Sequence, residues 1–304
     1  MSSMTQALAT VSPDQSRLAV GALLVAGLLW GLTWIPFRYF GSQGLNGLTF
    51  TMLGYGMVGV AVLPWLLLRR AEWLPQTRLV ALIALAGGGA NVCFTSALMA
   101  GEVVRVMLLF YLAPVWGVLG GRIAFGEPIT RLRVVGVVAA LGGAFLLLGG
   151  TAVFKTPPGL VDVLALASGI LYASQNIFTL AANRTPLYAK TLAVFVGCGV
   201  LSAFLVLVTR QVLPPVSGLI LLQLAAFTGI WMMMAMILTV YGVTRLEAGR
   251  SAILLVFELV AAVVSAMWIG GERLDGLEWL GAALITSAAL LEARSSPNKK
   301  GQAA

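Results

Sequence analysis

Ten apolar stretches, each long enough to cross a bilayer, follow one another along this chain. A helix needs about 20 apolar residues to span the hydrocarbon core. Helices satisfy their own backbone hydrogen bonds in lipid, and the stretches lack the alternation of a membrane β-barrel. The predicted spans are 18–40, 46–68, 78–100, 103–124, 131–150, 159–182, 190–209, 217–241, 249–270 and 276–292. The sequence therefore predicts an all-α integral membrane protein with ten transmembrane helices.

Charged residues make up only 10% of the 304 residues, while 60% are hydrophobic. A soluble domain carries roughly 25% charged residues. The net charge of +8 could indicate a nucleic-acid partner, but the basic residues stand at the ends of spans and form no stripe. We therefore expect the lipid bilayer as the surroundings of this chain, and no nucleic acid as a partner.

The basic residues also predict the orientation of the chain. With the N-terminus in the cytoplasm, 14 of the 19 Lys and Arg residues fall at cytoplasmic ends of spans. Cytoplasmic loops carry such an excess, so both termini are expected in the cytoplasm. Residues 1–17 are polar and the first apolar run is too long for a secretory signal core, so we expect the first span to be retained.

The second five spans look like a copy of the first five. The pairs aligned by a shift of 145 positions include Glu102 with Glu247, Arg105 with Arg250, and Gly126-Glu127 with Gly271-Glu272. Because five is odd, the second half enters the membrane in the opposite sense, which predicts two inverted five-helix repeats. The expected segments are a cytoplasmic tail at 1–17, repeats at 18–150 and 159–292, a linker at 151–158 and a cytoplasmic tail at 293–304.

Short motifs in both halves carry a family resemblance. They are Trp30-Gly31, Pro114, Gly126-Glu127 and Gly136 in the first half, and Glu258 and Gly271-Glu272 in the second. With them, residues 18–292 resemble the EamA branch of the drug/metabolite transporter superfamily, although Leu259 stands where Pro is usual. The resemblance implies a multi-pass protein of the bacterial inner membrane, with spans 1, 3, 4, 6, 8 and 9 around a cavity. Within the branch, the chain is most similar to bacterial aromatic amino acid exporters.

Three tryptophans near mid-depth, Trp30, Trp34 and Trp231, are candidates for the wall of that cavity. An indole N–H at this depth needs a hydrogen-bond partner, which lipid tails do not offer. A cavity wall and packing between helices would both provide one, so both interpretations stay open for these three residues.

Polar side chains near mid-depth form a second group of candidates. They are Asn91 and Thr95 on one face of the third span, Tyr111 in the fourth, and Tyr172, Gln175 and Asn176 on or beside a polar stripe of the sixth. Such groups cost free energy in lipid unless they pair or line water. Interhelical hydrogen bonding, at about 0.6 kcal/mol per contact, is the alternative to substrate binding. The stripe of the sixth span favours a binding role.

Glu258 is the deepest ionisable side chain of the chain. A buried carboxylate usually marks a substrate pathway, a proton relay or a counter-ion. We expect Glu258 to bind a substrate amino group or a coupling proton, and a fixed structural carboxyl is the alternative.

The sequence carries no pattern for catalysis or for a cofactor. It has no His and no GxxxxGK[ST] motif, and its two cysteines lie inside spans. We expect a protein that is not an enzyme, binds no metal or cofactor, and takes a small-molecule substrate. The predicted function is a secondary transporter that exports amino acids, with aromatic ones preferred. Export of other metabolites or organic cations is the first alternative, and a scaffold without transport is the second. A monomer is compatible with these expectations.

Overall fold

The computed structural model describes residues 13–126, 130–147, 158–243, 245–246 and 248–295. All regular secondary structure in these segments is helical, which confirms the all-α prediction for them. The α-helices are α2 (Pro13–Gly31), α3 (Trp34–Ser42), α4 (Gly47–Leu68), α5 (Thr77–Ala100), α6 (Val103–Phe110), α7 (Ala113–Phe125), α8 (Arg131–Leu147), α9 (Leu160–Ala181), α10 (Leu187–Val208), α11 (Gly218–Ala226), α12 (Met233–Val243), α13 (Ala248–Trp268) and α14 (Gly276–Ser295). A π-helical segment, η4 (Phe227–Met232), joins α11 to α12.

Seven helical segments of the described chain are long and apolar enough to cross a membrane, so the protein is a multi-pass membrane protein. They are Arg17–Ser42, Gly47–Leu68, Leu74–Ala100, Val103–Phe125, Leu160–Ala181, Leu187–Val208 and Gly218–Thr239. At the positions of the fifth, ninth and tenth expected spans lie α8, α13 and α14, of 17, 21 and 20 residues. Within the described residues, shorter apolar stretches lie at Val134–Leu146 of α8 and Phe257–Trp268 of α13. The number of ten spans stays a prediction.

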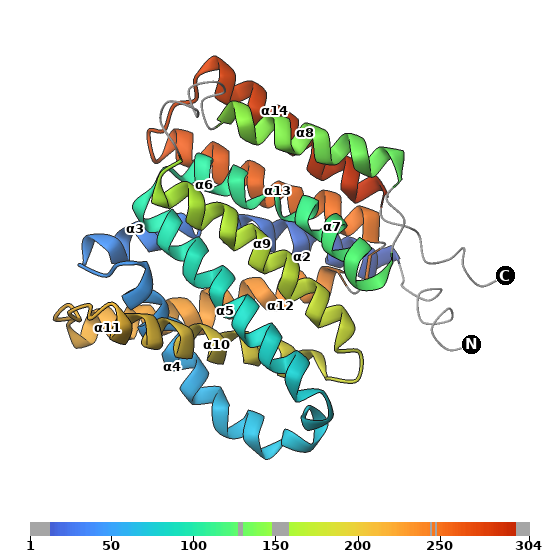
Figure 1. Cartoon of the computed structure of the whole chain (residues 1–304). Helices are drawn as coiled ribbons and strands as arrows, with labels where there is room; N and C mark the ends of the chain where they lie inside the picture. The colour runs from blue at the N-terminus through green and yellow to red at the C-terminus, as the bar shows by residue number, and fades with distance from the viewer. Residues whose placement is uncertain (1–12, 127–129, 148–157, 244, 247, 296–304) are drawn as a thin grey trace.

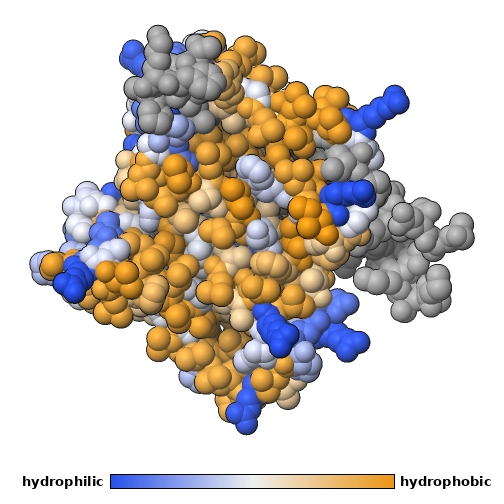
Figure 2. Space-filling view, viewed as in Figure 1, coloured by the Kyte–Doolittle hydropathy of each residue, from blue (hydrophilic) through white to orange (hydrophobic). Residues whose placement is uncertain are grey.

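The surface of the bundle is strongly apolar (Figure 2). Val60, Leu68 and Ile123, for example, are 71%, 83% and 86% exposed. Monomeric soluble proteins rarely expose contiguous apolar patches larger than a few hundred Å². Lipid tails are as apolar as these side chains, so a bilayer accommodates this surface without polar cover.

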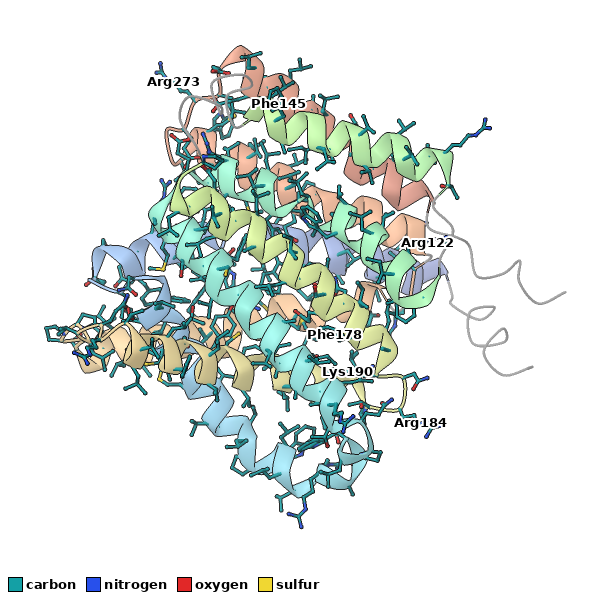
Figure 3. All side chains as sticks on the ribbon, in the orientation of Figure 1. Arg122, Phe145, Phe178, Arg184, Lys190 and Arg273 are labelled. Carbon is teal, nitrogen blue, oxygen red and sulfur yellow. The ribbon has the colours of Figure 1, made fainter. Side chains whose placement is uncertain are left out.

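The loops gather at two opposite ends of the bundle (Figure 1). We call the end at which α2 begins the terminal end, and the opposite one the distal end. Arg105 at the start of α6 binds Asp162 at the start of α9 through two hydrogen bonds of 2.6 and 3.0 Å at the distal end. Figure 3 shows Arg122 and Arg184 at the terminal end and Arg273 at the distal end.

Glycines allow pairs of helices to approach closely where no hydrophobic effect drives them together. A Cβ atom at Gly143 of α8 would lie only 2.7 Å from the carbonyl oxygen of Gly281 in α14. These two helices pack along each other at one edge of the bundle (Figure 1). The remaining helices, with α5 packed along α9 and α10, and α2 along α12 and α13, form the body that holds the candidate site.

Candidate functional site

Three of the apolar segments are interrupted partway across the bundle. α2 ends at Gly31 and α3 begins at Trp34, α6 ends at Phe110 and α7 begins at Ala113, and η4 separates α11 from α12. Irregular backbone at membrane depth is tolerated only where it is buried in protein or lines a water-filled cavity. π-Helical turns within α-helices are also frequent at functional sites. These three interruptions therefore mark the region of the candidate binding site.

The interruption after α2 frees a backbone carbonyl, and a tryptophan of another segment satisfies it. The Thr33 amide donates to the carbonyl of Trp30 at 3.2 Å, although a continuous α-helix would direct it to Leu29. The Leu29 carbonyl accepts instead from Nε1 of Trp231, at 3.1 Å. Nε1 of Trp30 donates to Oγ1 of Thr239, also at 3.1 Å. Both indoles therefore have partners at the contact of α2 with η4 and α12.

The interruption between α6 and α7 comes from Pro114, the second residue of α7. Proline has no N–H, so the carbonyl of Phe110 lacks its α-helical donor. Helix α9 passes close to this carbonyl at Gly169, where a Cβ atom would lie 2.9 Å from the oxygen. Tyr111, the residue at which α6 stops, is placed by this break beside α9 and α13.

Four of the predicted site residues, Tyr111, Tyr172, Asn176 and Glu258, come together here, and we call them the polar cluster. The Tyr111 hydroxyl and the Glu258 carboxylate are hydrogen-bonding partners. Tyr172 interacts electrostatically with the same carboxylate and forms a hydrogen bond with Asn176, one turn further along α9. Tyr172 is 41% exposed although its ring packs against Phe110 of α6, so the polar cluster keeps an accessible surface.

An aromatic wall adjoins the polar cluster. The ring centroid of Phe110 lies 4.8 Å from that of Phe94, 5.4 Å from that of Tyr172 and 5.8 Å from that of Tyr111. Phe94 and Phe110 were not among the predicted site residues, because a Phe in an apolar span cannot be told by sequence from a residue that faces lipid. The helical period of the third span could have identified Phe94, which follows the candidate Asn91 by three positions and so lies on the same face.

Three other predicted residues make contacts within the bundle in this conformation. Asn91 accepts a hydrogen bond of 3.1 Å from the Tyr55 hydroxyl, which joins α5 to α4. Gln175 lies against α5, because a Cβ atom at Gly87 would be 2.8 Å from its side-chain oxygen. Thr95 is 1% exposed, and its hydroxyl has no hydrogen-bond partner among the described residues. An unpaired buried hydroxyl can accept a partner from a substrate.

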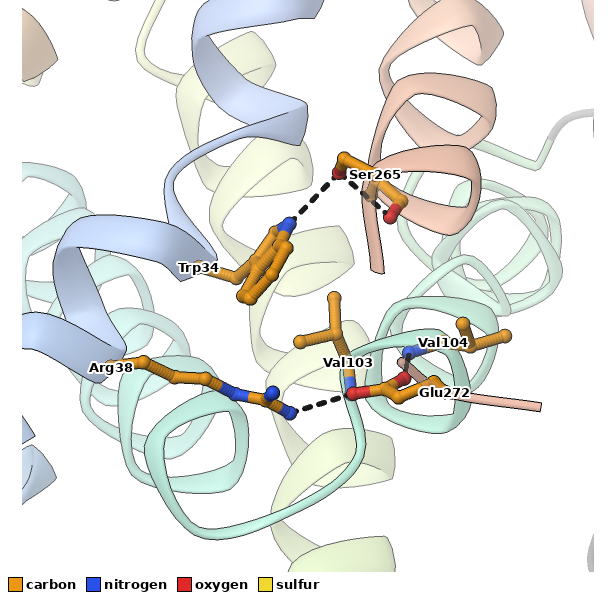
Figure 4. A network of polar contacts seen from close by, with 7 residues as sticks. Trp34, Arg38, Val103, Val104, Ser265 and Glu272 are labelled. Carbon is orange, nitrogen blue, oxygen red and sulfur yellow. Dashed lines mark hydrogen bonds and ion pairs between the residues drawn. The ribbon is translucent and has the colours of Figure 1, made fainter. Parts of the chain in front are cut away.

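Trp34 is buried away from the polar cluster. It is 4% exposed, and its Nε1 donates to Oγ of Ser265 at 2.9 Å, which joins α3 to α13 (Figure 4). The Arg38 guanidinium lies over the same indole, 5.0 Å from the ring centroid. In this structure Trp34 therefore belongs to the packing between helices near the distal end.

Glu272 closes the distal end of the bundle (Figure 4). Its carboxylate accepts from Arg38 at 2.6 Å and from the backbone amides of Val103 and Val104 at 2.8 and 2.9 Å. These amides are free donors at the N-terminus of α6, where the helix dipole also favours a negative charge. One side chain thus joins α3, α6 and the loop between α13 and α14, and we call these contacts the distal network.

Comparisons with known proteins agree with this architecture. The sequence model described as EamA-like transporter family matches residues 17–149 and again 159–293. A protein of Streptantibioticus cattleyicolor described as "Probable terminal-alkyne amino-acid exporter" is 26% identical over 301 residues, covering 94% of this chain and 96% of that protein. One solved crystal structure matches with a TM-score of 0.59 and 20% identity, covering 90% of this chain and 94% of the other, and this shows a similar fold.

Proposed function

Because this chain belongs to the EamA-like transporter family, we propose that it is a secondary transporter that exports amino acids, with aromatic ones preferred. A member of this family is a transporter and not an enzyme. The description of the Streptantibioticus relative as an amino-acid exporter supports this substrate class. The sequence has no phosphate-binding motif for ATP, so a gradient of the substrate or of an ion would supply the energy.

The observation that carries the proposal is a carboxylate next to a group of aromatic rings. Glu258 would bind the substrate amino group through charge-assisted hydrogen bonds. Phe110 and Tyr172 would pack against the substrate ring in an offset or edge-to-face geometry. The side-chain amide of Asn176, beside Tyr172, would donate to the substrate carboxylate.

The other predicted residues would complete the site as the protein changes conformation. Trp30 lies on the helix next to Glu258, since a Cβ atom at Gly31 would approach the Glu258 carbonyl oxygen to 2.7 Å, and Trp231 binds the Leu29 carbonyl of the same helix. Four predicted site residues would give up contacts within the bundle and contact the substrate instead. They are Trp34, Asn91, Thr95 and Gln175. The buried, unpaired hydroxyl of Thr95 supports this assignment best.

Alternating access would come from two inverted halves, 18–150 and 159–292, joined by the linker 151–158. The two matches to one family model support a duplicated unit. Gly126 and Gly271, equivalent under the repeat, have nearly equal backbone angles, with φ of 69° and 70°. Gly126 follows α7 at the terminal end, whereas Gly271 precedes Glu272 at the distal end, which supports inversion. A closed distal network fits a conformation open toward the terminal end.

The excess of basic residues at the terminal end supports a cytoplasmic location of that end, in the inner membrane of a bacterium. The tails 1–17 and 293–304 lie outside the described residues apart from 13–17 and 293–295. A single chain contains every residue assigned to the site, so the proposed working unit is a monomer.

Counterflow in liposomes tests the proposal. Vesicles that contain the full-length protein and are loaded with unlabelled Phe should accumulate external labelled Phe, and Trp or Tyr should compete better than Ala or Lys. Repeating the measurement with an imposed pH gradient identifies proton coupling. A carboxylate among aromatic rings also suits organic cations. Movement of a cationic dye without any movement of Phe, Trp or Tyr would therefore replace the amino-acid proposal with cation export.

A further inference from the structure

A groove of about 850 Å³ lies between α2 and α12, outside the proposed substrate site. Its lining includes Arg17, Gly21 and Val25, which follow one another at four-residue intervals along one face of α2, and Ile237 and Tyr241 of α12. Apart from Arg17 and the Tyr241 hydroxyl, the lining side chains are apolar or absent. The groove starts at the terminal end of the bundle, where α2 begins.

The groove opens toward the outside of the bundle. Val25 and Ile237, which line it, are 46% and 59% exposed. A different face of α2, with Ala19 and Leu23, is fully buried and packs on α12, where a Cβ atom at Gly242 would overlap the Leu23 side chain. In a membrane, the exposed apolar walls of this groove face lipid, so an acyl chain can enter it from the side.

Two arginines stand at the mouth of the groove. Arg17 is part of the lining and is exposed to solvent. Arg245 lies over the Tyr241 ring, with its guanidinium carbon 3.8 Å from the centroid, and donates to the Tyr241 carbonyl at 3.3 Å. Arginine binds phosphate through paired N–H donors. The charge at this mouth thus complements an anionic lipid headgroup.

The length of the groove fits one leaflet. From Arg17 to Val25 the helix rises about 12 Å, at about 1.5 Å per residue. Half of a hydrocarbon core of about 30 Å is about 15 Å. We propose that a phospholipid with an anionic headgroup binds here, with an acyl chain between α2 and α12 and its phosphate at Arg17. The acyl chains of any phospholipid could occupy the apolar groove. The arginines at its mouth would favour a phospholipid with an anionic headgroup.

The lipid would also fasten together two helices that carry site residues. α2 and α12 are already joined near mid-depth by the hydrogen bond from Trp30 to Thr239, and Trp231 of η4 binds the Leu29 carbonyl. A lipid at the terminal end of the same pair of helices would hold them at a second level. We expect bound anionic lipid to stabilise the folded protein, because a ligand that binds only the folded state raises its stability.

Thermal unfolding and native mass spectrometry of the purified full-length protein test this proposal without any substrate. Phosphatidylglycerol should raise the melting temperature, and phosphatidylcholine should not. Arg17→Gln should weaken phosphatidylglycerol binding about fivefold, the factor one basic side chain contributes near an anionic surface. Gly21→Leu should abolish it by filling the groove, since a Cβ atom at Gly21 meets no atom within 4 Å and the variant can fold.

Matched variants keep the test specific. Arg78→Gln removes another exposed arginine of the terminal end, and Gly142→Leu fills another open position, on α8, where a Cβ atom also meets nothing within 4 Å. Both should bind phosphatidylglycerol as the unmodified protein does. Equal binding of the two lipids, or full phosphatidylglycerol binding by Arg17→Gln and Gly21→Leu, would overturn the proposal. Transport of amino acids has no part in either readout, so a failure here leaves the proposed function intact.

Discussion

At the scale of single residues, Glu258 would decide which substrates the proposed site can hold. Its carboxylate has the Tyr111 hydroxyl as a partner, and a substrate ammonium group would be a second one. Glu258→Gln keeps the size of the side chain and removes its negative charge. A hydrogen bond to a charged group contributes about 1.5–3 kcal/mol, so we expect this variant to bind Phe about tenfold more weakly or worse. Equilibrium binding of labelled Phe to the purified protein measures the change.

A carboxylate elsewhere provides the control for this prediction. Glu278 accepts a hydrogen bond from the Asp275 amide at 2.9 Å near the start of α14, and it is partly exposed. Glu278→Gln should leave the affinity for Phe unchanged. If Glu258→Gln retained full affinity as well, the carboxylate would have no role in binding and the amino group would need another partner.

Gly31 permits the close approach of α2 to the backbone of α13 at Glu258. A Cβ atom there would lie 2.7 Å from the Glu258 carbonyl oxygen and 2.8 Å from the Ala261 Cβ. We expect Gly31→Ala to lower the free energy of unfolding by about 1–3 kcal/mol, the usual effect of overpacking. Thermal unfolding in detergent measures this, with Gly142→Ala as the matched change in open space. Equal melting temperatures for the two variants would contradict this prediction. They would show that α2 and α13 can move apart to accept the added methyl group without loss of stability.

Sequence could predict the depth of these residues but not their partners. The position of Glu258 within a span identified it as a candidate, and the structure brings it to Tyr111. Trp30 and Trp231 were expected to need partners for their indoles, but the partners, Thr239 and the Leu29 carbonyl, depend on which faces of α2 and α12 meet. That choice is made by packing across more than 200 positions of sequence, which a local pattern does not contain.

At the scale of helices, the distal network joins elements that would separate in the proposed alternating access. Glu272→Gln removes the charge that holds Arg38 and the amides of Val103 and Val104. Because hydrogen bonds to a charged group are worth about 1.5–3 kcal/mol, we expect the ratio of open to closed distal ends to rise about tenfold. Val104 is 2% exposed, so the labelling rate of Val104→Cys by a membrane-impermeant maleimide reports this opening in a chain without its two native cysteines.

Arg273, next to Glu272, provides the control for this prediction. Arg273→Gln changes a charge in the same loop without removing any contact of the Glu272 carboxylate. It should leave the labelling rate at Val104→Cys unchanged. Identical rates in Glu272→Gln and Arg273→Gln would mean that apolar packing alone closes the distal end.

The interruptions of the helices were predictable where the covalent chemistry of one residue causes them. Pro114 lies within the predicted fourth span, and α6 ends four residues before it, at Phe110. Leu259 stands where Pro is usual, and α13 runs through it without a break. The π-helical η4 had no such signal, because it contains no Pro and its Trp231 is held by the Leu29 carbonyl of another helix.

At the scale of the whole molecule, hydropathy and length were enough to predict a multi-pass helical protein. They work because every backbone group in lipid must be paired within the protein, which leaves few folds to choose from. Hydropathy alone does not predict which of these helices pack against one another. The predicted fifth span pairs with the predicted tenth through Gly143 and Gly281, a contact that only the folded bundle reveals.

The two ends of the bundle should face opposite sides of the membrane, because α6 and α7 together start in the distal network and end at Gly126. Arg122 at the terminal end and Arg273 at the distal end are far apart and exposed (Figure 3). In a chain without its two native cysteines, an impermeant maleimide added to intact cells should label Arg273→Cys. It should label Arg122→Cys only in inverted vesicles, since the excess of basic residues predicts that this end lies in the cytoplasm. Labelling of both positions from the same side would contradict a bundle that spans the bilayer from end to end. Reversed labelling would keep the span and invert the direction in which the proposed export runs.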